Sequence, residues 1–163
     1  MTNFRDVAAA VRRSDDARGL RVALIAARFN DVIVQPLIDG ALEAWQRHGG
    51  EPSRCTVLRV PGAFELPLAA RRFAQTGRFD AIVALGCVIR GDTPHFDFVA
   101  GESARGIAQA AYDTSVPVAF GVLTTENIEQ AKARCAPGPA NKGAEALETV
   151  IEMVLLLRQA DAP

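Results

Sequence analysis

Residues 88–99, VIRGDTPHFDFV, bring proton-transfer and anion-binding residue types into one short stretch. His95 is one of only two histidines in the chain, and an imidazole exchanges protons near neutral pH. Thr93 and Pro94 are residue types that open a helix, and the amide donors of such a first turn hold anions. We therefore predict a site of proton transfer beside a bound anion. The structural alternative is a histidine that only caps a helix.

Two cations later in the chain could complete such an anion site. Arg134 and Lys142 lie on either side of the proline- and glycine-rich segment CAPGPAN. Either side chain could pair with an anion that helix amides attract, whereas a solvated surface cation is the alternative. The second histidine, His48, precedes Gly49 and Gly50 at the end of a helical pattern, and we interpret it as structural.

Residues after the first two apolar segments could bind a planar, hydroxylated molecule. Phe29, in RFN, is suited to stacking on a planar ring, or alternatively it folds onto a neighbouring helix. In VPGAFE, residues 63–65 would form a first helical turn with open N–H groups. Glu65 would accept hydrogen bonds from a polyol, or would only stabilise the helix dipole.

Four apolar segments alternate with helical patterns along the chain. The apolar segments are typical of parallel strands covered on both faces. They span 21–27, 54–60, 80–89 and 116–124, and helical spacing is found in 32–50, 61–77, 94–113, 126–135 and 142–158. Because parallel crossovers are right-handed, we predict an α/β fold, a flavodoxin-like three-layer α/β/α sandwich with a four-stranded parallel sheet. Ligands of such sheets bind beyond the carboxyl ends of the strands, where Phe29, Glu65 and His95 fall.

Composition predicts a single domain that binds small molecules. The chain has 163 residues, of which 49% are hydrophobic, enough for one buried core. We assign residues 1–20 to an N-terminal arm and residues 21–160 to the domain. The 18 Lys and Arg against 19 Asp and Glu leave no basic excess for nucleic acid.

Cysteine usage and apolar runs exclude further classes. Cys55, Cys87 and Cys135 include no CxxC pair, so we predict neither a metal site nor a disulfide. The chain has no P-loop and no GxGxxG motif. No run approaches 18 apolar residues and no signal-peptide pattern opens the chain, so we predict a cytoplasmic protein without membrane association.

Five blocks, in this order and at these intervals, resemble the lumazine synthase family. They are RFN, VPGAFELP, DAIVALGCVIRGDTPHFDFV, PVAFGVLTTENIEQAKAR and NKGAEALE, within residues 21–157. The resemblance implies condensation of 5-amino-6-(D-ribitylamino)uracil with 3,4-dihydroxy-2-butanone 4-phosphate. The product would be 6,7-dimethyl-8-ribityllumazine, with phosphate and water released, in the penultimate step of riboflavin biosynthesis. It also implies that no metal or redox cofactor takes part.

The resemblance implies a role for each candidate residue. His95 would be the catalytic proton-transfer residue, and Phe29 would stack on the pyrimidine. The remaining substrate-binding residues would hold the ribityl chain and the ring (Ala63, Phe64, Glu65, Cys87, Val88, Ile89 and Phe120) or the phosphate (Asp92, Thr93, Arg134 and Lys142). In this family the sites lie between subunits of a homopentamer, so Arg134 and Lys142 would act on the adjacent chain's site. Riboflavin synthase is an implied partner.

The same residues bear on other functions and assemblies. A non-catalytic flavin- or lumazine-binding module has no need of His95 and Arg134 together. A phospho-receiver domain does not fit, because Asp15 and Asp16 precede the first strand and no acid ends the third. Asp92 would leave the phosphate contact at its position to the backbone. The linker CAPGPA lacks the Lys-Gly pattern of many members that form sixty-subunit shells, and it carries no insertion, so a pentamer and a shell both stay open.

Overall fold

The computed structural model describes residues 16–162. Within them the strands are β1 (Val22–Ala27), β2 (Cys55–Val60), β3 (Ala81–Ile89) and β4 (Val118–Thr125). The α-helices are α2 (Asp31–Arg47), α3 (Leu66–Ala74), α4 (His95–Thr114), α5 (Ile128–Cys135) and α6 (Lys142–Ala160). Two short 3-10 helices, η1 (Pro52–Arg54) and η2 (Ala63–Glu65), precede β2 and α3.

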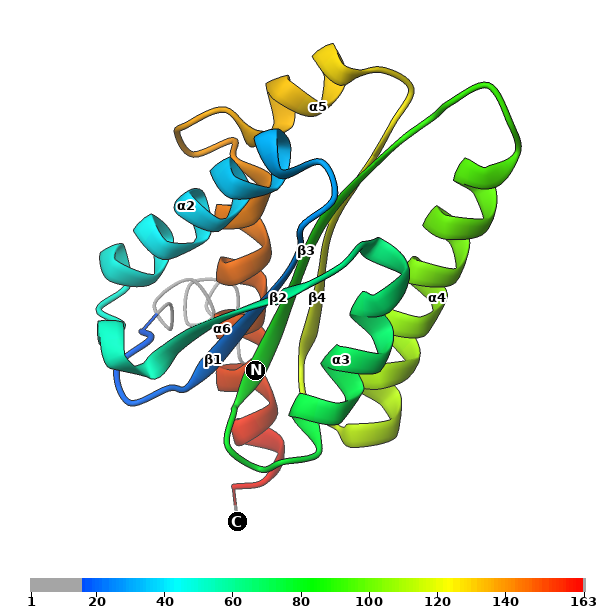
Figure 1. Cartoon of the computed structure of the whole chain (residues 1–163). Coiled ribbons are helices and arrows are strands. Elements are labelled where there is room, and N and C mark those ends of the chain that lie inside the picture. The colour runs from blue at the N-terminus through cyan, green and yellow to red at the C-terminus, as the bar shows by residue number, and fades with distance from the viewer. Residues whose placement is uncertain (1–15, 163) are drawn as a thin grey trace, which may run out of the picture.

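The four strands form one parallel sheet in the order β2-β1-β3-β4. Helices α2 and α6, with α5 beside them, cover one face, and α3 and α4 cover the other (Figure 1). The predicted flavodoxin-like three-layer α/β/α sandwich is confirmed. The chain leaves β1 toward β2 on one side and returns as β3 on the other, so a crevice opens between the carboxyl ends of β1 and β3.

Four of the five predicted helix starts differ from the structure, by one to five residues. The helix expected over 61–77 begins as η2, and α3 starts only at Leu66 with Pro67 in its first turn, where a missing N–H costs nothing. Helix α4 begins at His95 with Pro94 in the capping position, one residue later than expected. The Thr93 hydroxyl still accepts a hydrogen bond from the His95 amide at 3.4 Å.

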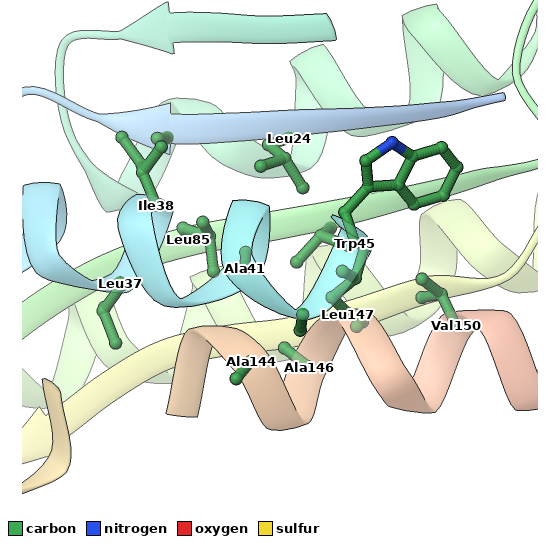
Figure 2. Close-up of a cluster of buried hydrophobic side chains, with 14 of the residues drawn as sticks. Leu24, Leu37, Ile38, Ala41, Trp45, Leu85, Ala144, Ala146, Leu147 and Val150 are labelled. Atoms are coloured by element: carbon green, nitrogen blue, oxygen red, sulfur yellow. The ribbon is translucent and has the colours of Figure 1, made fainter. Parts of the chain in front are cut away.

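The larger core lies between the sheet and the pair α2 and α6. Figure 2 shows Trp45, Ala41 and Ile38 of α2 facing Leu24 and Leu85 of the sheet, with α6 side chains packed beside them. The indole N–H of Trp45 donates to the Glu51 carbonyl at 2.8 Å, so this large ring is buried without an unpaired polar atom.

Helices α2 and α6 approach each other closely enough to exclude a side chain at one position. A Cβ added to Gly143 would lie 1.9 Å from the Leu37 carbonyl oxygen, which is backbone and has no rotamer by which to move away. This contact sets the distance between the two helices and therefore the position of the start of α6, which is part of the candidate site described below.

The described part of the predicted N-terminal arm joins the core. Ala17 and Leu20 are fully buried, and the Ala17 amide donates to the His48 carbonyl at 2.9 Å. Residues 1–15, the rest of that arm, lie outside the described residues, so the division into arm and domain stays a prediction. None of the helices within residues 16–162 is long and apolar enough to span a membrane.

Replacing Gly143 by alanine should destabilise the fold by about 1–3 kcal/mol or more, because the new methyl group meets the Leu37 backbone. Gly101→Ala in α4 is the matched control: its Cβ would meet nothing within 4 Å, and the change should stabilise the helix by roughly 0.5–1 kcal/mol. Urea unfolding at equal protein concentration measures both variants. Similar midpoints for the two would contradict the close helix packing.

Candidate active site

The carboxyl ends of β1, β2 and β3 surround a hollow of about 430 Å³, within the size range of small-molecule sites. We call it the β1–β3 hollow. It is lined by Phe29, Gly62, Ala63, Phe64, Glu65, Cys87, Val88, Ile89, Gly91, Thr93, His95, Phe96 and Val99. Most of these side chains are apolar, and one carboxylate and one imidazole stand among them. The hollow therefore suits a flat molecule with a polar rim.

The exit of β1 is held open by Asn30. This residue takes a left-handed conformation with φ of 60°, and its side-chain amide donates to the Cys87 carbonyl at 2.9 Å. The bond joins the ends of β1 and β3 across the crevice. The Phe29 amide donates to the Pro61 carbonyl at 3.0 Å, while its side chain is 72% exposed. An aromatic ring is thus presented at the mouth of the hollow and not packed onto a helix.

The turn after β2 supplies the opposite wall. Gly62 is extended, and a Cβ there would lie 3.2 Å from a carboxylate oxygen of Glu65. Ala63 is buried, while Phe64 and Glu65 are exposed toward the hollow. The 3-10 turn leaves backbone donors and the Glu65 carboxylate at the same edge, where a ligand with several hydroxyl groups could bind.

The end of β3 forms the floor of the hollow. Cys87 is buried and Val88 and Ile89 are half-buried. Burial raises the pKa of the Cys87 thiol to about 11, and the neighbouring Cys135 adds to the shift. A thiol that stays protonated at neutral pH is a poor nucleophile, so Cys87 provides shape and backbone groups to the hollow and not covalent chemistry.

His95 stands in the first turn of α4, and Arg90 holds that turn to the end of β4. The Arg90 guanidinium pairs with Glu126 at 2.9 Å and with Asp97 at 3.2 Å, and it lies 4.2 Å from the centre of the Phe96 ring. These contacts join the segment before α4 to the segment after β4. The exposed imidazole of His95 is therefore carried on an anchored turn at the rim of the hollow.

A second hollow of about 450 Å³ runs along the free edge of β4, and we call it the β4 hollow. It is lined by residues 118–124 of the strand together with Arg134, Lys142, Glu145, Ala146 and Thr149. The Lys142 ammonium pairs with Glu145 at 2.5 Å, and Arg134 donates to the Gln130 carbonyl at 2.9 Å. Both cations are exposed, and the Phe120 ring beside them is 44% exposed.

Asn141 fixes the two cations relative to the sheet. Its side chain is buried, and its amide donates to the carbonyls of Pro36 at 3.1 Å, Cys135 at 2.8 Å and Ala136 at 3.3 Å. Its side-chain oxygen accepts from the first free amides of α6, at 2.8 and 3.1 Å. One amide group thus joins α2, the end of α5 that carries Arg134, and the start of α6 that carries Lys142.

The structure divides the predicted site residues between the two hollows. The β1–β3 hollow gathers those expected around the ring and the imidazole: Phe29, Ala63, Phe64, Glu65, Cys87, Val88, Ile89, Thr93 and His95. Phe120, Arg134 and Lys142 line the β4 hollow instead. Asp92 is exposed between two lining residues and lines neither hollow. In one chain, His95 and Arg134 therefore do not share a cavity.

Several lining residues were not named from the sequence. Val99 is four residues after His95 and so shares its face of α4, a spacing that could have found it. Gly62 and Gly91 line the hollow from the loops before η2 and α4, and Phe96 lines it from the first turn of α4. No periodicity in the sequence reports these positions. His48, interpreted as structural, lies outside both hollows and its ring contacts the Glu148 carboxylate at 3.1 Å. Within residues 16–162, no cluster of three or more His, Cys, Asp or Glu is placed to hold a metal ion.

Fold and site define a class: an α/β protein with a ligand site at the carboxyl edge of a parallel sheet. The sequence model of the 6,7-dimethyl-8-ribityllumazine synthase family matches residues 19–158. A 6,7-dimethyl-8-ribityllumazine synthase from Chlorobium phaeobacteroides is 54% identical over 149 residues, which are 91% of this chain and 96% of that protein. Relatives of the same name from Chlorobium luteolum and Nitratidesulfovibrio vulgaris are 55% and 53% identical, over 87% and 88% of this chain and 92% of each relative. The chain belongs to the 6,7-dimethyl-8-ribityllumazine synthase family and is an enzyme.

Asn141→Ala should destabilise the protein by about 2–4 kcal/mol, because it removes the α6 cap and leaves buried carbonyls without a donor. Asn127→Ala is the matched control. Its side chain caps α5 through one bond to the Gln130 amide at 2.9 Å and is exposed, so its loss should cost only about 0.5–2 kcal/mol. Chemical unfolding compares the two variants. Equal losses would show that Asn141 is no more than a helix cap.

Proposed function

We propose that this protein condenses 5-amino-6-(D-ribitylamino)uracil with 3,4-dihydroxy-2-butanone 4-phosphate. The product is 6,7-dimethyl-8-ribityllumazine, phosphate and water are released, and the reaction is the penultimate step of riboflavin biosynthesis. The observation that carries the proposal is the family match over residues 19–158, within which one histidine stands at the rim of a ring-sized hollow. Incubating the protein with both substrates and following lumazine absorbance and fluorescence tests it, and binding of the product without its formation would indicate a binding module.

In the proposed complex the uracil occupies the β1–β3 hollow. Phe29 stacks on the ring, as its exposed position at the mouth allows. The backbone at 87–89 meets the ring edge, and Ala63, Phe64 and Glu65 hold the ribityl chain through the open turn and the carboxylate. Thr93 and the backbone at Asp92 receive the phosphate at the start of α4, where helix amides favour an anion.

His95 transfers protons during the reaction. The 5-amino group attacks the ketone of the phosphate substrate, and loss of water gives an imine. Phosphate then leaves by elimination, and the ring closes on the second carbonyl with loss of another water. Each step moves protons between nitrogen, carbon and oxygen, and none needs a protein nucleophile, in keeping with the raised pKa of the Cys87 thiol. Much of the acceleration comes from holding two reactants together, which supplies about 7–11 kcal/mol in favourable cases.

The active site is completed by a second copy of the chain in a homopentamer. Two observations support this assembly: His95 and Arg134 line different hollows of one chain, and the β4 hollow lies at an unpaired sheet edge with an exposed Phe120 ring. In the assembly the β4 hollow of one subunit faces the β1–β3 hollow of its neighbour, so Arg134 and Lys142 reach the phosphate there. We place the enzyme in the cytoplasm, with riboflavin synthase as its partner.

His95→Ala should lower the rate of single-turnover lumazine formation by about 10²-fold or less, because it removes acid–base help and leaves the binding of both reactants intact. His48→Ala is the matched control, since that ring pairs with Glu148 outside both hollows, and its rate should stay near that of the unchanged protein. A loss near 10⁵-fold for His95→Ala would contradict this division between positioning and proton transfer.

Arg134→Ala should raise the KM for the phosphate substrate by roughly tenfold or more while the KM for the uracil changes little, because a charged hydrogen bond to the phosphate is lost. Arg105→Ala is the control: that arginine is exposed on α4, pairs with Glu102 and lines neither hollow. An unchanged KM for the phosphate substrate would remove Arg134 from this role.

Mixed assemblies test whether the two residues come from different subunits. When His95→Ala and Arg134→Ala chains are refolded together in equal amounts, about a quarter of shared sites should contain both native residues. Activity should then rise well above that of either variant alone. No rise in an assembly shown to be mixed would mean that each chain builds its own site.

A further inference from the structure

A third hollow lies at the amino ends of the strands, opposite the candidate active site. It has a volume of about 260 Å³, and we call it the arginine hollow. It is lined by Arg21, Ser53, Arg54, Thr56, Arg78 and Phe79. The six residues of β1 separate it from the β1–β3 hollow, a distance of roughly 20 Å along an extended strand.

The sheet register brings its three arginines together. Val22 at the start of β1 pairs with Cys55 of β2 and with Ala81 of β3. The residues just before these three strands therefore meet at one edge: Arg21 before β1, Arg54 at the end of η1, and Arg78 in the turn between α3 and β3. The cluster follows from parallel pairing of three segments far apart in the sequence.

Positive charge exceeds negative charge around the arginine hollow. Asp80 is shared between Arg21 at 3.5 Å and Arg158 at 3.7 Å, and Glu51 pairs with Arg54 at 3.4 Å. These are long ion pairs, and neither carboxylate lines the hollow. Among residues 16–162, Arg78 makes no ion pair at all. The hollow is therefore walled by cations whose charge the described carboxylates only partly balance.

The guanidinium groups also keep donors available. Each has five N–H donors, yet Arg21 and Arg54 make only single long bonds to backbone carbonyls, to Gly77 and Gly19, both at 3.4 Å. Arg78 lies 5.6 Å from the centre of the Phe79 ring, which itself packs edge-on against Phe73. Stacking orients a guanidinium without using its N–H groups, so those of Arg78 remain available to a ligand.

We propose that the arginine hollow binds a phosphate group, either as inorganic phosphate or as the head of a small phosphomonoester. Guanidinium forks match the oxygens of phosphate in geometry and charge, and the hydroxyls of Ser53 and Thr56 add donors at the same wall. The volume is below the 300–1,000 Å³ usual for drug-sized ligands, which favours a phosphate head over a whole nucleotide. The site is independent of the proposed catalytic function.

Calorimetric titration with inorganic phosphate at constant ionic strength tests the site. The titration is made on Arg134→Ala protein, so that the phosphate proposed to bind at the active site, weakened about tenfold or more, contributes less to the signal. Adding Arg54→Gln and Arg78→Gln should weaken the remaining phosphate binding by about tenfold or more. Arg72→Gln is the matched control, because Arg72 is exposed on α3 and lines none of the three hollows, and it should leave binding unchanged. If the variant with Arg54→Gln and Arg78→Gln binds phosphate as tightly as the Arg72→Gln control, the proposal is overturned.

A single substitution and other anions test the same hollow further. Arg78→Gln alone breaks no ion pair of the described residues, so it replaces the double change if that variant unfolds, and it should still weaken binding. If glycerol phosphate competes with inorganic phosphate, the hollow binds phosphomonoesters. If only inorganic phosphate binds, the ligand is the free phosphate ion. Equal binding of acetate would overturn recognition of phosphate. If the Arg134→Ala protein binds as many phosphate ions per chain as the protein without substitutions, the assignment of Arg134 to an active-site phosphate fails. The Arg54→Gln and Arg78→Gln changes still test the arginine hollow in that case.

Discussion

The cationic part of the site depends on one buried side-chain amide. Asn141 donates to carbonyls of α2 and of the end of α5, and it accepts from the first amides of α6. Among residues 16–162, no other side chain is hydrogen-bonded to both the end of α5 and the start of α6. The Asn141 side-chain amide packs directly against Gly40 of α2, where an added Cβ would overlap it. The two exposed cations are thus carried on backbone segments that this one side chain joins to α2.

A second asparagine does the same for the β1–β3 hollow. Asn30 joins the end of β1 to the Cys87 carbonyl of β3, at the point where the strand order reverses. Parallel strands open a crevice there in any such sheet, but the crevice alone does not fix the position of an aromatic ring at its mouth. The left-handed turn at Asn30 directs Phe29 outward over the hollow. Because one asparagine side chain sets each part of the site, the positions of both parts depend on the packed sheet beneath them.

The order of strands and helices could be predicted from the sequence, because uninterrupted apolar runs and helical spacing report burial directly. Residues that follow a strand, such as Phe29 and His95, could also be placed at one edge of the sheet. The start of α3 could not be predicted, since PGAFELP is compatible with either one helix or a turn followed by a helix. Nor could the multiple bonds of Asn141, which reads in the sequence as an ordinary helix cap before KGAE.

The separation of His95 from Arg134 could not be deduced from residue patterns either, because it depends on which strand lies at the edge. With β4 outermost, Arg134 on α5 and Lys142 at the start of α6 line the β4 hollow and not the crevice between β1 and β3. Only the family resemblance suggested beforehand that the two groups serve one site from different chains. The arginine hollow has the same origin at the other end of the sheet: its members are separate in sequence, and the register of Val22 with Cys55 and Ala81 makes them neighbours.

The proposed site depends more on the positions of its side chains than on their reactivity. Burial keeps the Cys87 thiol protonated, so this thiol adds no strong nucleophile. In the proposed reaction, bringing two reactants into contact is the main contribution of the protein, and a misplacement of about 1 Å lowers such a rate by up to about 100-fold. This explains why buried amides and glycine contacts far from any substrate matter to such a reaction. It also predicts that substitutions at the helix packing around Asn141 affect turnover through the position of the cations, even where the fold persists.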